Sequence, residues 1–151
     1  MSKPFHSSKI TLAELRALIC SFAKQRGVNR VIFNNRGTTV KGTYCASNKN
    51  MYVNLDQTKK AMMHTFFHEL AHHEAVVNSL WLDYHFDRKF YSSEDVFLIE
   101  NNIDRIAQRL WQTHVNSKYW GRYIFAYNQN KKQFLIKNFI SQWNIVKLPA
   151  E

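Results

Sequence analysis

Apolar residues in the first third of the chain predict one helix followed by three short strands. In residues 11–25, apolar side chains recur at the three- and four-residue spacing of an amphipathic helix. The next stretch alternates apolar and polar positions and predicts strands at Val31–Phe33, Thr38–Tyr44 and Met51–Leu55. Because consecutive strands joined by short turns commonly pair with each other, we expect a small antiparallel three-stranded sheet.

Two longer amphipathic helices follow the strands. The first begins after Asp56 or Thr58, either of which could cap it, and continues to about residue 80. Its core-facing stripe is expected to contain Met63, Phe66, Phe67 and Leu70. A polar, aromatic stretch at 81–92 leads to the second helix, which runs from about Ser93 to residue 115. Helices stacked on a small sheet indicate an α+β domain.

The C-terminal extension, residues 116–151, is basic and rich in aromatic residues. Within it, YIFAY predicts a strand and KKQFLIKNFISQWNIV predicts a helix. We expect its aromatic side chains to pack over the rest of the protein. A chain of 151 residues suits one domain, residues 1–151, with its core at about 10–115.

The segment MHTFFHELAHHEA, residues 63–75, carries four histidines and two glutamates on the first long helix. His68 and His72 belong to an H-E-x-x-H sequence, and this spacing places them one turn apart on the same helix face. Both imidazoles could bind one Zn²⁺ ion, and Glu69 could then act as a general base on a water held by the metal. His73 points about 100° away from His72 and is expected at the surface.

A catalytic zinc ion usually has three protein ligands, and two later residues could supply the third. Glu100 lies in the apolar stripe of the second long helix, where burying a carboxylate is costly unless it is paired or binds a cation. His85, in the stretch between the two helices, could reach the metal instead. Further candidates to support the ligands or to stabilise the oxyanion of a hydrolysis are His64, Asp104, Tyr84 and Tyr91.

The net charge of +10 is unevenly distributed along the chain. Residues 1–50 carry nine Lys/Arg and one acid, residues 51–114 carry six and nine, and residues 115–151 carry six and one. The basic flanks could bind nucleic acid or an acidic protein. We expect no membrane partner and a cytoplasmic location, or the host cytoplasm for a phage protein, because a signal peptide and a long apolar run are both missing.

HELAH and the later stretch ENNIDRIA, residues 100–107, together resemble the ImmA/IrrE-like zinc metallopeptidases. The later stretch matches the family's pattern at Glu100, Asp104 and Ala107. The resemblance covers about residues 28–112. It implies a minimal zincin-like domain in which the two histidines of HELAH and Glu100 bind zinc, with Glu69 as the base. It also implies that the substrate is a regulatory protein.

A weaker resemblance links the chain to the SprT-like metallopeptidases, which carry HELAH and then a later histidine. That histidine is usually followed by glycine, whereas Phe86 follows His85 here. This resemblance would make His85 the third ligand in place of Glu100, and it would imply a DNA-associated substrate.

The sequence therefore predicts a zinc metallopeptidase that hydrolyses peptide bonds in a regulatory or DNA-associated protein. The alternative is a non-catalytic metal-binding protein that has a peptidase-like fold and serves in nucleic-acid or protein interaction. The basic flanks favour this alternative, and zinc-dependent cleavage of a partner would argue against it.

Overall fold

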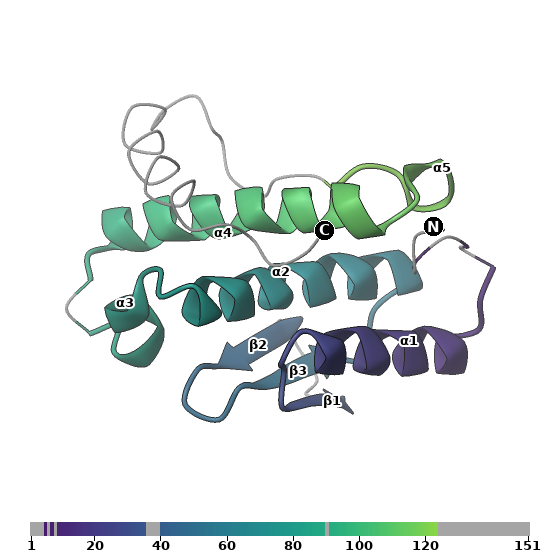
Figure 1. Ribbon diagram of the computed structural model, residues 1–151, viewed down its shortest axis with the longest axis horizontal. Coiled ribbons are helices and arrows are strands. Elements are labelled where there is room, and N and C mark those ends of the chain that lie inside the picture. The colour runs from purple at the N-terminus through teal and green to yellow at the C-terminus, as the bar shows by residue number, and fades with distance from the viewer. Residues whose placement is uncertain (1–4, 6, 8, 36–39, 90, 124–151) are drawn as a thin grey trace.

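A computed structural model describes residues 5, 7, 9–35, 40–89 and 91–123 of the protein. Its elements in chain order are α1 (Leu12–Gln25), β1 (Arg30–Asn34), β2 (Gly42–Cys45), β3 (Asn50–Asn54), α2 (Lys59–Val77), α3 (Leu82–Phe86), α4 (Ser93–His114) and α5 (Ser117–Trp120). A three-stranded sheet packed with helices confirms the α+β class (Figure 1). Apart from Tyr123, the strand and the helix predicted in the C-terminal extension lie outside the described residues.

The sheet is mixed, with strand order β1-β3-β2, so the prediction of an antiparallel sheet was wrong. β3 pairs antiparallel with β2, but it pairs in parallel with β1, from Arg30 opposite Asn50 to Asn34 opposite Asn54. Met51 and Val53 of β3 are fully buried, whereas the other two strands carry no buried residue. The central position of β3, between two partner strands, keeps Met51 and Val53 away from solvent. The spacing of the turns in the sequence does not reveal this strand order.

Helix α2 lies between α4 and the sheet, with α1 on the sheet side (Figure 1). Thr58 caps α2, since its hydroxyl accepts a hydrogen bond from the N–H of Ala61 at 3.1 Å. Ser92 caps α4 in the same way through the N–H of Asp95. The two long helices therefore begin where the sequence predicted, and the HELAH helix is central, as expected.

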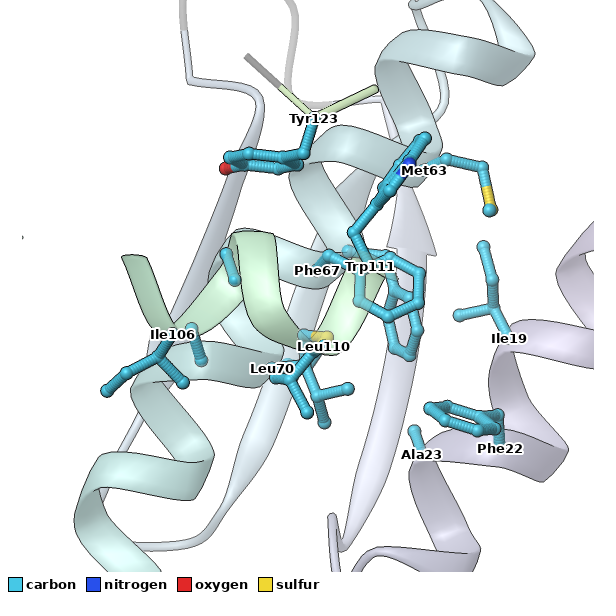
Figure 2. Packing of buried hydrophobic residues seen from close by; sticks show 14 of the residues in the cluster. Ile19, Phe22, Ala23, Met63, Phe67, Leu70, Ile106, Leu110, Trp111 and Tyr123 are labelled. Carbon is cyan, nitrogen blue, oxygen red and sulfur yellow. The ribbon is translucent and has the colours of Figure 1, made fainter. Parts of the chain in front are cut away.

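Aromatic rings fill the space between α1, α2 and α4. The Phe67 ring lies 5.1 Å from Phe66, 5.5 Å from Phe5 and 5.6 Å from Trp111, centroid to centroid, all edge to face. Figure 2 shows Phe67 and Trp111 side by side, with Phe22 of α1 nearby. The predicted stripe of α2 is fully buried at Met63, Phe66, Phe67 and Leu70. This packing fixes the rotation of α2 about its axis, and with it the direction of the histidines.

The polar, aromatic stretch between the long helices contains the short helix α3. Trp81 precedes it in a left-handed conformation, with φ of 51°. Tyr84 of α3 is fully buried and faces the core, so this turn is anchored to the rest of the protein. Among the described residues, no helix is both long and apolar enough to cross a membrane.

Candidate metal site

His68, His72 and Glu100 come together where α2 faces α4. The Nε2 atoms of both histidines lie 3.2 Å from the same carboxylate oxygen, Oε1 of Glu100. One ligand atom from each residue falls within 4.8 Å of the other two, so the three side chains could hold a metal ion. His72 and Glu100 are buried, and the side chain of His68 is one-quarter exposed. The site is thus reachable from solvent on one side.

The outer nitrogen of His68 is held by α4. Nδ1 of His68 lies 2.9 Å from Oδ1 of Asp104, and the Tyr123 hydroxyl donates to the same oxygen at 3.2 Å. A carboxylate behind a metal-binding histidine fixes the ring and raises its basicity as a ligand. The sequence indicated Asp104 as a supporting residue, but it did not indicate Tyr123.

His85 lies behind His72 and is not part of the metal-binding group. Its Nε2 is 2.9 Å from Nδ1 of His72, and its Nδ1 is 2.9 Å from the carbonyl oxygen of Trp81. A carbonyl oxygen can only accept, so Nδ1 of His85 carries a proton and donates to it, and Nε2 of His85 accepts a hydrogen bond from Nδ1–H of His72. Burial lowers the pKa of His85 to about 4, which keeps this ring neutral. His85 therefore orients His72 with its Nε2 lone pair toward the site.

Glu100 is held by Tyr84, whose hydroxyl donates a hydrogen bond to Oε2, the carboxylate oxygen turned away from the histidines. Tyr91 packs its ring edge to face on Tyr84 at 5.5 Å. Arg88 places its Nη2 4.0 Å from the same Oε2. Tyr84 and Tyr91 thus support the ligand carboxylate from one side.

In each of these three side chains, one polar atom is hydrogen-bonded to a neighbouring side chain and another faces the other two members of the group. Asp104 holds His68, His85 holds His72, and Tyr84 holds Glu100. Two imidazole nitrogens and a carboxylate oxygen, each held from behind, are a donor set that suits a divalent transition metal. The residues present therefore fit a divalent metal ion.

Charge at the site also favours a cation. Burial opposes ionisation of Glu100, but His72, His68 and Tyr84 together hold its pKa far below the usual range. Burial likewise disfavours protonated His68, yet hydrogen bonds to Asp104 and Glu100 raise its pKa to about 10. A metal ion would take the place of the proton on Nε2 of His68, while Asp104 would keep the proton on Nδ1.

Glu69 faces a cleft of about 450 Å³ next to the three ligands. The walls of the cleft come from α2, from α4, from α3 and the chain just after it, and from residues 42–44 of β2. The side chain of Glu69 is almost completely buried, and this burial raises its pKa, while His72 and His68 act in the opposite direction. A raised pKa brings a carboxylate closer to the range in which a general base is most effective at neutral pH.

Gly42 allows β2 to approach α2 at the edge of this cleft. A Cβ atom at this position would lie 2.4 Å from Cγ2 of Thr65 and 2.9 Å from the carbonyl oxygen of Tyr52. It would also lie 3.3 Å from Cγ of Glu69. A glycine here therefore keeps the strand, the helix and the side chain of Glu69 in contact.

Two other histidines of α2 lie outside the metal-binding group. His64 packs against the rings of Trp111, at 4.9 Å, and Tyr123, at 5.1 Å, and is not part of the metal-binding group. His73, predicted at the surface, is fully buried. Its Nε2 lies 2.8 Å from the carbonyl oxygen of Arg26, and its Nδ1 lies 2.8 Å from the Tyr44 hydroxyl. The prediction of a surface position for His73 was wrong because β2 and the end of α1 cover this side of α2.

Comparison with known protein families, with curated proteins and with solved structures gave no significant match for this chain.

Proposed function

We propose that this protein is a zinc-dependent metallopeptidase with a zincin-like fold. The observation that carries the proposal is the convergence of His68, His72 and Glu100 on one point, with Glu69 beside them in an open cleft. Three protein ligands with access from solvent are typical of catalytic zinc, whereas structural zinc is usually closed by four. The resemblance of HELAH and the later glutamate to ImmA/IrrE-like enzymes agrees with this donor set.

A zinc ion in this site would polarise the scissile carbonyl group and make water more acidic. Glu69 takes a proton from the attacking water as the new C–O bond forms. When the C–N bond breaks, Glu69 returns this proton to the nitrogen of the leaving amine. Asp104 and His85 keep the two imidazoles in the orientation that the metal requires.

The substrate is proposed to be an extended peptide bound along β2. This strand lies at one edge of the sheet, with β3 on its other side, and residues 42–44 line the cleft. An exposed strand edge offers backbone N–H and C=O groups to which a peptide can add as a further strand. This would deliver the scissile bond to Glu69 without a deep pocket. We propose a regulatory or DNA-associated protein as the source of the peptide, on the basis of the family resemblances and the basic flanks.

Replacing Glu69 by Gln tests the proposal. Loss of a general base commonly slows a reaction by about 10²–10⁴-fold, so we expect cleavage of a peptide library by the zinc-loaded protein to fall by that factor. Zinc content should stay the same, because Glu69 is not one of the three ligands. Asp56→Asn is the matched control, since Asp56 is exposed and lies outside the cleft. Full activity in Glu69→Gln, or no zinc-dependent cleavage by the unchanged protein, would contradict the proposal. The second result would favour a non-catalytic metal-binding protein.

A further inference from the structure

Arg88 is the one arginine or lysine among the described residues that line the metal cleft. It follows α3 and its side chain is 57% exposed. The guanidinium carbon lies 4.3 Å from the centre of the Tyr84 ring. Because Tyr84 is fully buried, this stacking gives an otherwise flexible side chain a defined place at the entrance.

The guanidinium lies close to the metal-binding atoms without being bound to them. Nη2 of Arg88 is 4.0 Å from Oε2 of Glu100, which is too far for a hydrogen bond. The other oxygen of the same carboxylate, Oε1, is the one that faces His68 and His72. The Glu100 carboxylate therefore lies between the Arg88 guanidinium and the point where a substrate carbonyl would meet the metal.

Three other side-chain donors near the cleft already have acceptors. Tyr84 donates to Glu100, and His85 donates to the carbonyl oxygen of Trp81. On the β2 side, Nε2 of His73 donates to a carbonyl, so its Nδ1 must accept from the Tyr44 hydroxyl. Arg88 is thus the lining residue whose N–H groups are best placed to meet a new negative charge.

We propose that Arg88 is a catalytic residue that stabilises the oxyanion of peptide hydrolysis, an inference that rests on the proposed function. As the water oxygen bonds to the carbonyl carbon, the carbonyl π electrons move to its oxygen, and Glu69 takes the proton. The guanidinium donates hydrogen bonds to that oxygen while it is negatively charged. When the C=O bond re-forms and the C–N bond breaks, the proton passes to the amine. Arg88 neither gains nor loses a proton.

The test compares Arg88→Gln and Arg88→Lys with the unchanged, zinc-loaded protein. Removing an oxyanion donor commonly lowers kcat by about 10²–10³-fold, and we expect that loss in Arg88→Gln with little change in KM. Arg88→Lys should recover part of it, because lysine keeps the charge but loses the planar fork. Zinc content should be unchanged in both. Lys89→Gln is the matched control, since Lys89 is the exposed neighbour outside the cleft.

Binding of a peptide phosphonate, measured by calorimetry, gives a readout that does not require turnover. Its tetrahedral anionic group resembles the oxyanion, so its affinity for Arg88→Gln should fall at least 10-fold, while Lys89→Gln binds it normally. Equal phosphonate affinity in Arg88→Gln and the unchanged protein would overturn the proposal, and so would an unchanged kcat. If no peptide is cleaved, the proposed function fails, and the role of Arg88 in oxyanion stabilisation fails with it. Phosphonate binding lost in Arg88→Gln would then show an anion site without hydrolysis.

Discussion

Asp104 is the residue on which the orientation of His68 depends. One of its oxygens accepts hydrogen bonds from both the His68 imidazole and the Tyr123 hydroxyl, and the side chain is almost fully buried. Without it, the His68 ring could rotate away from His72 and Glu100. The carboxylate would therefore contribute to metal binding without being a ligand itself.

Replacing Asp104 by Ala should weaken zinc binding by about 10–100-fold, the usual effect of removing the group behind a ligand histidine. Competition with a chromophoric chelator measures this affinity directly. Asp95→Ala, on the exposed first turn of the same helix, is the control and should bind zinc normally. Equal affinity in Asp104→Ala and the control would show that His68 does not need this partner.

At the scale of single residues, the sequence predicted the three side chains that the structure brings together. HELAH places His68 and His72 one turn apart on one helix face, and a carboxylate in an apolar stripe indicated Glu100. Arg88 and His73 carried no such signal. The position of Arg88 at the cleft depends on stacking on Tyr84, and the burial of His73 comes from β2 and the end of α1, which are distant in sequence.

At the scale of elements, the close contact between β2 and α2 positions one wall of the cleft. It depends on Gly42, because a side chain there would meet Thr65 and the backbone of Tyr52. The same contact sets the distance between the strand edge, where the peptide is proposed to bind, and Glu69.

Replacing Gly42 by Ala should lower the free energy of unfolding by about 1–3 kcal/mol, the usual cost of forcing an extra methyl group into a packed region. Urea denaturation measures this loss. Adding Thr65→Ser removes the Cγ2 atom that the new methyl group meets at 2.4 Å, and it should restore part of the stability. A Gly42→Ala protein as stable as the unchanged one would mean that β2 lies farther from α2 than described.

Helix positions followed from local sequence, but the sheet order did not. Hydroxyl caps at Thr58 and Ser92 begin the two long helices, and both are legible as local signals. The parallel pairing of β1 with β3 depends instead on which strand has the most apolar face to bury. Residue-by-residue periodicity is the same in parallel and antiparallel strands, so it could not distinguish the two arrangements.

At the scale of the whole molecule, the end of the described chain reaches back to the metal site. Tyr123 follows α5, and its hydroxyl contacts Asp104, which holds His68. The indole N–H of Trp111 donates to the carbonyl oxygen of Gly121 at 2.8 Å, which fixes this return of the chain. The beginning of the C-terminal extension is therefore part of the structure that supports the ligands.

Replacing Tyr123 by Phe should reduce zinc affinity by about 2–12-fold, because one hydrogen bond is usually worth about 0.5–1.5 kcal/mol. This loss should be smaller than that in Asp104→Ala, since the carboxylate itself remains. Tyr119→Phe removes an exposed hydroxyl from the same part of the chain and is the control. If both tyrosine variants bind zinc equally well, the extension does not act on the site through Asp104.

Anomalous scattering at the zinc absorption edge, from crystals of the purified protein grown with zinc, is the most direct test of the central claim. We expect one strong peak within coordination distance of Nε2 of His68, Nε2 of His72 and Oε1 of Glu100. A peak that includes His85 in place of Glu100 would contradict the ligand set described here. An absent peak, with the two histidines turned apart, would mean that HELAH lies on a helix without a metal, and the proposed peptidase activity would be wrong.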